Sequence, residues 1–528
     1  MNRMKLSRLP EREDERIKMQ QWRRALPCKK RNCHVIQKYH ALCVECAPLT
    51  IFLLPCYNFY NLHTTFQKIN LWDRSYMKTR LKAQEYLFVA SMLFGLVFGA
   101  GNLIFPAGMG QQAGAALYPA ILGFCITGVG LPLLGIIAIS ISSSEGLFDI
   151  GCKVGRSFSY FFTCALYLCI GPLFAIPRTS TVSFQVGAAP LIPEPLQDAA
   201  LFVFTLLFFA AALYFSLRPS DILTWIGKIL NPIFLFFLSI LILTAVLHPM
   251  GDIASAAPTE AYRTHSFFTG LIEGYNTMDV LAALAFGNIL VHAIKGLGLS
   301  NPKDISFSTI IAGCFSTSCM AVIYCALTYI GAQSRSMYGI DANGGDVLYH
   351  IALHCFGAFG SILLGIIITF ACLKTAIGLI TACSTTFSAL FPKSISYNNY
   401  VIVFSLFSFG ISNVGLSRII TYSLPVLYFL YPISIVLIFL CLIEGVRGYA
   451  HRCVFICTIG GTMIAAAFDF IGALPPAVQN TLPKPDLLHA LAQSLPLSSI
   501  GMGWVVPAAA GFCIGIFCVF IQSHRQKD

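Results

Sequence analysis

The sequence FGAGNLIFPAG, from Phe98 to Gly108, places Gly99, Gly101, Asn102 and Pro106 inside an otherwise apolar run. A plain membrane-spanning helix carries Leu or Ile at such positions, since glycine costs about 1 kcal/mol relative to alanine in a helix interior and proline costs more. In hydrocarbon, broken helix is tolerated only where its backbone faces protein or a water-filled cavity. The stretch therefore predicts a helix that is interrupted at mid-depth to build a binding site.

The composition indicates a protein that crosses a membrane many times. Of the 528 residues, 56% are hydrophobic and only 11% are charged, whereas soluble domains carry about 25% charged residues. Apolar runs long enough to span as helices, about 20 residues each, exclude the short alternating segments of a β-barrel. We predict an all-α polytopic membrane protein with twelve transmembrane helices, near residues 86–108, 116–140, 160–187, 199–217, 222–247, 267–293, 306–331, 358–386, 397–413, 420–444, 453–473 and 500–522.

The basic residues predict the orientation of these spans. Lys and Arg concentrate in cytoplasmic loops, and most of those after Met77 fall on one side if the start of the first span is cytoplasmic. Twelve spans with both termini in the cytoplasm is therefore the consistent arrangement, in contact with the lipid bilayer on all sides.

Residues 1–76 differ in kind from the rest and supply most of the net charge of +11. Cys43 and Cys46 follow no zinc-ligand spacing, and residues 41–60 lack the clean apolar core of a signal peptide. We expect residues 1–76 to be a poorly ordered basic extension, with translation from an upstream start as one interpretation of its origin. Residues 77–528 form the predicted membrane domain.

The sixth span carries a second interruption, EGYNTMDVLAALAFG, from Glu273 to Gly287. An odd offset of five spans reverses the direction through the membrane, so spans one and six would hold matching positions in two inverted repeats, and paired interruptions of this kind point to a transporter site. Helix N-termini suit a carboxylate and exposed carbonyls suit a cation. The breaks predict a small-molecule site for an amino acid, built from Gly99, Ala100, Gly101, Asn102, Leu103, Tyr275, Asn276 and Thr277.

Several polar residues inside other spans are candidates for coupling or for structure. If the third span stays helical after Pro177, Arg178 and Gln185 share one face. A buried arginine needs a partner, and Glu273 or Asp279 is the natural candidate. In the eighth span, Lys374 stands beside Thr375.

At these residues the sequence resembles the branched-chain amino acid carrier family of cation symporters. The matching motifs are FGAGNLIFP, GPLFAIPRTSTVSFQVGAAPL, EGYNTMDVLAALAFG, ACLKTAIGLITAC and ISNVGLSRII, which are collinear across residues 77–528. The resemblance implies a sodium-coupled importer of leucine, isoleucine and valine in the bacterial inner membrane. It also implies a LeuT-type fold of five plus five helices, with repeats at about 84–248 and 265–445 and two extra helices at about 453–522.

The same resemblance implies where the coupling ion binds. The motif match places Gly95, Phe98, Ala371 and Thr375 around a sodium ion, and Asn102 would add a side-chain oxygen. Gln185 departs from a frequent glutamate of the family and Lys374 from an uncharged residue, so coupling to protons stays open. We expect sodium, because a lysine in the cytoplasmic half of a span can extend its ammonium to the interface.

Other functions remain as alternatives. A related carrier could move other amino acids or small solutes, because one methylene in an apolar pocket changes binding by only about 1 to 3 kcal/mol. A channel would show a selectivity filter or a charged ring, which the sequence lacks. The absence of HExxH and GxxxxGK[ST] motifs argues against an enzyme or an ATP-driven pump. We expect no cofactor beyond the coupling ion and no nucleic-acid partner, and the sequence leaves the oligomeric state open.

Overall fold

The computed structural model describes residues 80–142, 144, 146–218, 231–447, 451–479 and 494–525. The chain divides into two units, residues 1–76 and residues 77–528, and everything described below belongs to the second. The expected basic extension at 1–76 and the far ends of both termini lie outside the described residues.

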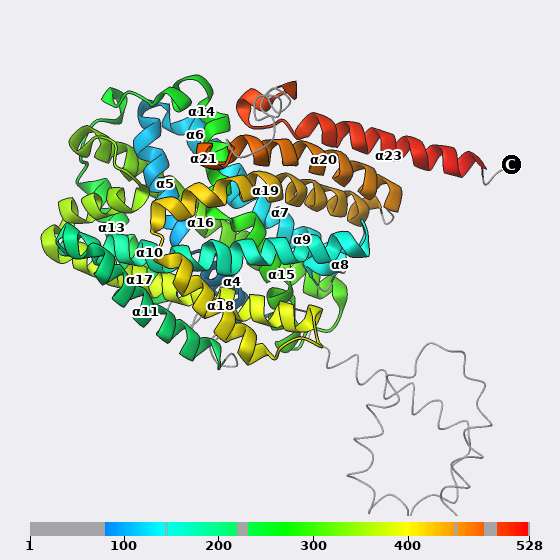
Figure 1. The fold of residues 1–528 in the computed structure, drawn as a ribbon, viewed down its shortest axis with the longest axis horizontal. Helices are drawn as coiled ribbons and strands as arrows, with labels where there is room; N and C mark the ends of the chain where they lie inside the picture. Colours follow the sequence, from blue (N-terminus) through cyan, green and yellow to red (C-terminus); the bar gives the residue numbers. More distant parts are fainter. Residues whose placement is uncertain are drawn as a thin grey trace, which may run out of the picture. The chain divides into compact units, whose positions relative to one another are not determined.

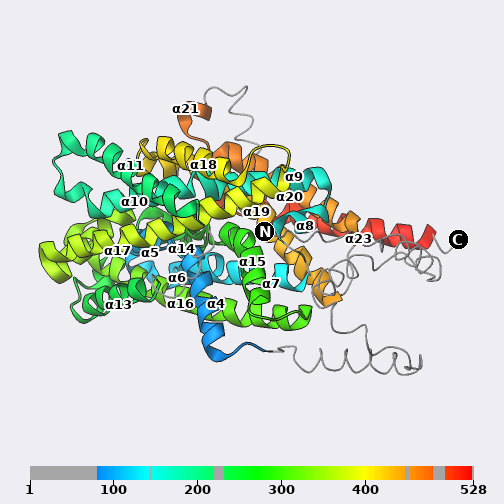
Figure 2. The ribbon, with the colours of Figure 1, turned by 90° about the horizontal axis from the view of Figure 1, so that it is seen from below.

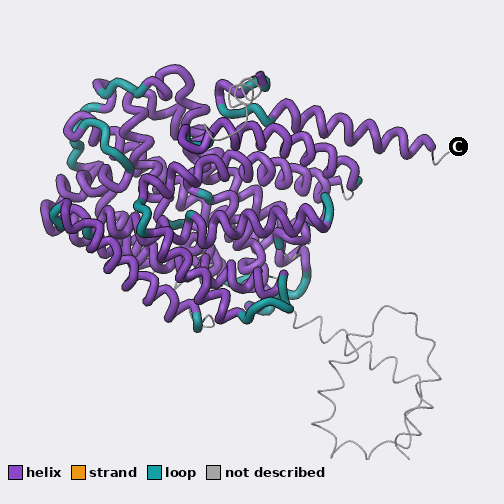
Figure 3. The backbone as a smooth tube through the Cα atoms, viewed as in Figure 1, coloured by secondary structure: helices purple, strands orange, loops and turns teal. Residues whose placement is uncertain are grey.

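Within these residues the secondary structure is helical throughout (Figure 3). Eight helical segments are long and apolar enough to cross a membrane, and a ninth results if the bent pair Asp279–Gly287 and Ile289–Gly296 counts as one span. In the described residues, helix overlaps each of the twelve predicted ranges, but only eight or nine segments meet the length and apolarity of a span, so the count of twelve stays a prediction. The main helices are α4 (Ala83–Val97), α5 (Ala100–Ala113), α6 (Leu117–Cys125), α7 (Leu131–Ile141), α8 (Leu147–Cys152), α9 (Arg156–Leu168), α10 (Ala175–Gly187), α11 (Gln197–Ser216), α13 (Asn231–Leu247), α14 (Glu260–Glu273), α15 (Asp279–Gly296), α16 (Pro302–Tyr338), α17 (Gly344–Leu390), α18 (Tyr397–Ser412), α19 (Leu416–Arg447), α20 (Arg452–Ala473) and α23 (Val505–Arg525).

The first and sixth predicted spans are interrupted where the sequence predicts. Helix α4 stops at Val97 and α5 begins at Ala100, with Phe98 and Gly99 in extended conformation. Helix α14 passes through a 3₁₀ turn, η8 (Gly274–Thr277), and Met278 adopts a left-handed conformation with φ of 62° before α15 starts. Left-handed backbone is rare for a residue with a side chain, so this second break is a sharp one.

Helix packing brings both interruptions to the same region. Helix α5 packs on α16, α14 on α6, α15 on α7, and α10 on α17. Figure 1 shows α20 lying between α19 and α23, and Figure 2 shows the helices turned by 90°. The interrupted helices are thus enclosed by α7, α10, α16 and α17.

Helix α17 consists of two parts. Gly357 has φ of 61° and ψ of −156°, which bends the chain between a first part and the membrane-crossing part at Ile362–Leu390. The positive φ is one that glycine adopts without the steric cost that a side chain would add.

Candidate substrate and ion site

The break in the first span is held by its own asparagine. Asn102 is 1% exposed, and its Oδ1 accepts a hydrogen bond of 2.8 Å from the backbone N–H of Gly99. This bond satisfies one of the unpaired donors at the start of α5, as an N-terminal cap does. The structure thus shows the Asn102 oxygen stabilising the helix start, and its predicted role as a cation ligand stays a prediction.

The other end of the Asn102 amide joins the two breaks. Its Nδ2 donates to Asp279 Oδ1 at 2.7 Å and also to the hydroxyl of Tyr324, and Tyr324 donates to Asp279 Oδ2 at 2.6 Å. Asp279 is the first residue of α15 and is fully buried. A buried carboxylate is costly unless it is hydrogen-bonded, and here α5 and α16 supply the donors. Sequence reasoning missed Tyr324, because one tyrosine in a long apolar helix gives no spacing signal.

Arg178 does not pair with a carboxylate. Its Nη1 donates to the backbone carbonyl of Asn276 at 2.7 Å, and the guanidinium lies 5.1 Å from the ring centroid of Phe105. Ion pairs among the described residues include neither Arg178 nor Glu273, so the predicted Arg178 to carboxylate pair is wrong. The unwound η8 turn frees a carbonyl that can accept from arginine, which helical periodicity alone does not reveal.

The Arg178 guanidinium also lies against the first break. A Cβ at Gly101 would come within 2.8 Å of Arg178 Nη2, so a side chain there would have to displace the guanidinium. Among the described residues, Arg178 Nε and Asn276 Oδ1 are buried without a hydrogen-bond partner. One unpaired donor and one unpaired acceptor therefore lie on residues that are themselves in contact.

A small cavity lies at this junction. It has a volume of about 30 Å³ and is lined by the Gly99–Asn102 break together with Arg178, Thr277 and Thr375. A water molecule needs about 10 to 15 Å³ of such space, so the cavity has room for one or two waters and is far too small for an amino acid. The two breaks therefore lie too close together in this structure for a substrate to fit between them, and Ala100 and Leu103 are buried beside the cavity.

Three of the predicted ion ligands, Phe98, Ala371 and Thr375, lie close together where the end of α4 meets α17. Thr375 Oγ1 lies 3.3 Å from the carbonyl oxygen of Phe98 and 3.1 Å from that of Ala371. Gly95 lies in the last turn of α4, two residues before its end, and a Cβ there would overlap the Asn231 amide. Carbonyl and hydroxyl oxygens are ligands that suit a hard cation.

Lys374 does not extend to the interface, and the expectation that it does is wrong. The side chain is 1% exposed, its ammonium donates to Asn231 Oδ1, and it lies 4.9 Å from the ring centroid of Phe234 and 5.6 Å from that of Phe94. No pattern in the sequence pointed to Asn231, which is the first described residue of α13. An amide acceptor and two aromatic faces replace water around the buried charge.

Gln185 lies apart from the breaks, in a group of polar residues that we name the Asp346 cluster: Gln111, Gln185, Asp341, Asn343, Asp346 and His350. Gln185 Nε2 donates to Asp346 Oδ1 at 3.0 Å, and Asn343 Nδ2 donates to Asp346 Oδ2 at 2.9 Å. Burial raises the pKa of the Asp346 carboxyl, and the Gln185 hydrogen bond opposes this. Gln111 and His350 both contact Asp341 Oδ2. The cluster therefore joins α5, α10 and the first part of α17.

Glu273 ends α14 directly before η8 and is half-buried. Of the predicted residues, the structure thus brings together the Gly99–Leu103 and Tyr275–Thr277 breaks, Arg178, Asp279 and Thr375. Gln185 and Lys374 instead contact Asp346 and Asn231.

The fold is that of solved membrane transporters. The structure superposes with a TM-score of 0.52 on Mhp1, a nucleobase-cation-symport-1 family transporter solved in a closed conformation, covering 82% of this chain and 92% of that one at 14% identity. A manganese transporter from Eremococcus coleocola gives the same TM-score of 0.52, over 82% and 94% of the two chains. At such low identity the likeness establishes the architecture alone, and the class is a multi-pass transporter-like membrane protein.

Sequence relatives identify the family. Residues 82–522 match the family model described as branched-chain amino acid transport protein. The chain is 47% identical over 439 residues to the branched-chain amino acid permease BrnQ of Lactobacillus delbrueckii subsp. lactis, covering 83% of this chain and 97% of that one. It is 38% identical over 440 residues to the branched-chain amino acid transport system 2 carrier protein of Pseudomonas aeruginosa, with coverage of 83% and 97%. The chain belongs to the branched-chain amino acid transport protein family, which confirms the resemblance and agrees with a protein that is no enzyme.

Proposed function

We propose that the protein imports leucine, isoleucine and valine by cation symport, using alternating access in a bacterial inner membrane with both termini cytoplasmic. The observation that carries the proposal is the meeting of two interrupted helices at a buried arginine, in a chain whose relatives are named branched-chain amino acid permeases. Broken helices that face each other at mid-depth are a typical way for transporters to bind a charged small molecule.

The packing of the helices supports twelve spans with a five plus five inverted repeat. The first span packs on the seventh, through α5 and α16, and the sixth packs on the second, through α14 and α6. If spans one to five are exchanged with spans six to ten, the pair of spans one and seven becomes the pair of spans six and two. The third and eighth spans, α10 and α17, pack on each other and exchange places under the same operation.

We place the substrate between the two breaks, next to the small cavity described above. Its carboxylate would bind the N–H groups of Gly101 to Leu103 and the unpaired Nε of Arg178, because a guanidinium and a helix N-terminus both favour an anion. Its ammonium would bind backbone carbonyls between Tyr275 and Thr277, where Arg178 now donates to Asn276. In this structure Arg178 therefore donates to a carbonyl that would bind the substrate ammonium. Substrate binding would require the two breaks to move apart.

We propose sodium as the coupling ion. The oxygens of Phe98, Ala371 and Thr375 converge, while the Lys374 ammonium is directed to Asn231 and the rings of Phe94 and Phe234. The Lys374 ammonium is therefore paired with the Asn231 amide and does not use the oxygens of Phe98, Ala371 and Thr375.

Uptake of labelled leucine into proteoliposomes tests the function, with a sodium gradient and a proton gradient imposed separately. Saturable uptake that collapses with the sodium gradient would support the proposal. Uptake that follows only the proton gradient would refute sodium coupling, and no uptake of any branched-chain amino acid under either gradient would refute the substrate.

Three variants test the ion site. Thr375→Ala removes the hydroxyl that joins the two carbonyls and should abolish sodium dependence. Thr369→Ala is the matched control, because that hydroxyl bonds only within its own helix, to Gly365 at 2.7 Å. Lys374→Met keeps the length of the buried side chain and should keep sodium dependence. Sodium dependence that first appears in Lys374→Met would contradict the assignment, because it would show the ammonium in the cation position.

A further inference from the structure

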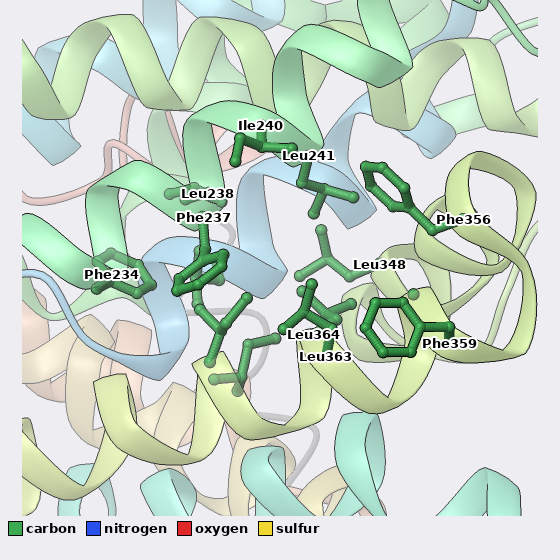
Figure 4. Close-up of a pocket in the computed structure, with 14 residues that line it drawn as sticks. Phe234, Phe237, Leu238, Ile240, Leu241, Leu348, Phe356, Phe359, Leu363 and Leu364 are labelled. Atoms are coloured by element: carbon green, nitrogen blue, oxygen red, sulfur yellow. The ribbon is translucent and has the colours of Figure 1, made fainter.

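A second cavity lies away from the breaks, between α13 and α17. Its volume is about 170 Å³, and its fourteen lining residues come from α13, from both parts of α17 and from Leu103 of α5. Figure 4 shows Leu348, Leu363 and Leu364 facing Phe237 and Leu241 across it, with Phe356 and Phe359 at one end.

The walls of this cavity define what it can hold. All fourteen lining residues are leucine, isoleucine, phenylalanine or glycine, so the cavity offers no side-chain donor, acceptor or charge. An amino acid would leave both charged groups unpaired there, at a prohibitive cost. A cavity of about 150 Å³ lined by such residues stays free of water and binds small hydrocarbons. The ligand must therefore be a hydrocarbon.

The position of the cavity indicates the source of that hydrocarbon. Phe359 at its edge is 72% exposed and Ile240 is 38% exposed, whereas Leu103, Leu348 and Ile368 at its walls are each 1% exposed. The flanking surface continues with exposed large apolar side chains on both helices, which are Ile233, Phe236 and Leu243 on α13 and Ile362, Ile366 and Phe370 on α17. Such a surface on membrane-crossing helices is the one that meets acyl chains. The cavity thus leads from the lipid-facing surface to α5.

We propose that this cavity is a binding site for the acyl chain of a bilayer lipid, which enters between α13 and α17. The bound chain contacts Leu348 and Phe356, which both belong to the first part of α17. It also contacts Leu103, which follows the Gly99–Asn102 break. It fills a space that would otherwise lack packing partners, and a void forfeits the dispersion contacts of its walls. This inference stands independently of the transported substrate.

Photolabelling in proteoliposomes tests the proposal. The full-length protein is reconstituted with a phosphatidylcholine that carries a diazirine near the end of one acyl chain, irradiated, and mapped by peptide mass spectrometry. We expect label on the buried wall residues Leu241, Leu364 and Ile368, which lipid around the protein cannot reach. Label confined to exposed residues such as Leu243 and Ile366 would overturn the proposal.

Matched tryptophan variants sharpen the test. Leu241→Trp fills the cavity from its wall, and Ile240→Trp blocks it from a partly exposed position if Leu241→Trp fails to fold. Leu243→Trp is the control, because Leu243 lies on the same helix, is 60% exposed and does not line the cavity. We expect label at Leu364 and Ile368 to fall at least fivefold in Leu241→Trp and Ile240→Trp and to stay unchanged in Leu243→Trp. Equal labelling of all variants would refute an acyl chain in this space.

Discussion

The junction of the two breaks and the cavity between α13 and α17 are opposite in character. At the junction, the two breaks and the Arg178 side chain lie close together and leave about 30 Å³. Between α13 and α17, apolar side chains leave about 170 Å³ open. Of these two regions, the junction of the breaks is therefore the more tightly packed.

The physical cause of this difference is the cost of an unpaired polar group. Asp279, Asn102 and Tyr324 must meet one another closely, because a buried carboxylate without donors is strongly unfavourable. Leucine and phenylalanine beside a membrane have no such requirement, since lipid can occupy whatever space they leave. We expect substitutions at the junction to affect transport strongly and substitutions at the apolar cavity to affect mainly stability.

The largest expected effect is at Gly101. In Gly101→Leu the new side chain would collide with Arg178 Nη2, which a Cβ alone would approach to 2.8 Å. Two hydrogen bonds to charged groups of the substrate would be lost, each worth about 1.5 kcal/mol or more, so leucine uptake should fall at least about 100-fold. Radiolabelled uptake and leucine binding to the purified protein measure this.

Gly460→Leu on α20 is the control for the change of residue type, because nothing lies within 4 Å of a Cβ there. It should insert and transport normally. Unchanged leucine affinity in Gly101→Leu would show that the break at Gly99–Asn102 is structural and that the substrate binds elsewhere.

The sequence predicted the junction because its residues are unusual for the interior of an apolar membrane helix. Gly99, Gly101 and Asn102 interrupt an apolar run, as do Gly274 to Thr277, and the structure interrupts both helices there. It failed where the partner of a polar residue lay on another helix. The amide of Asn231 holds Lys374, and the carbonyl of Asn276 holds Arg178. These pairings depend on how helices that are distant in the sequence pack on each other. The periodicity of a single helix carries no information about that packing.

The apolar cavity was beyond prediction for a related reason. Leu241, Leu364 and Ile368 are ordinary residues for membrane helices, and nothing in their order distinguishes a filled contact from an empty one. Only the relative placement of α13 and the two parts of α17, bent at Gly357, creates the space.

The second prediction concerns the Asp279 hydrogen bonds. Tyr324→Phe removes the donor to Asp279 Oδ2 and leaves the ring in place. A hydrogen bond to a charged group contributes about 1.5 to 3 kcal/mol, so we expect leucine uptake to fall about tenfold or more. Tyr329→Phe, at an exposed position on the same helix, is the control and should transport normally. Wild-type uptake in Tyr324→Phe would show that the network linking the breaks is dispensable.

The third prediction is a pH dependence at the Asp346 cluster, which precedes the membrane-crossing part of α17. Burial raises the pKa of Asp346, and Asp341 raises it further, whereas Gln185 and His350 lower it. Because burial raises this pKa, burying the Asp346 carboxyl is most favourable at low pH and becomes less favourable as pH rises through the pKa. The Gln185 hydrogen bond lowers the pKa and so stabilises the ionised carboxylate. Gln185→Glu replaces a donor by a second carboxylate, so two acids must share a proton. We expect its uptake to match wild type at mildly acidic pH and to fall several-fold at alkaline pH.

Gln185→Met separates the charge from the lost hydrogen bond. It removes the donor to Asp346 Oδ1 without adding an acid, so its pH profile should lie between those of wild type and Gln185→Glu. Uptake is measured across pH at a constant sodium gradient. Identical profiles for all three proteins would mean that the contact between α10 and the start of α17 does not open or close during transport.

The smallest expected effect on transport is at the wall of the apolar cavity. Ile368→Ala enlarges a space that is already open, and truncating a buried isoleucine costs about 2 to 5 kcal/mol of stability, so the purified protein should melt at a lower temperature in detergent. Ile366 lies two residues away, faces the lipid and is 51% exposed. Ile366→Ala should therefore melt like wild type. Leucine uptake should change less than about twofold in both, because neither side chain lines the space between the breaks. A tenfold loss of uptake in Ile368→Ala, with normal insertion, would contradict the contrast between the two regions, since the apolar wall would then take part in binding or in the motion that closes the site.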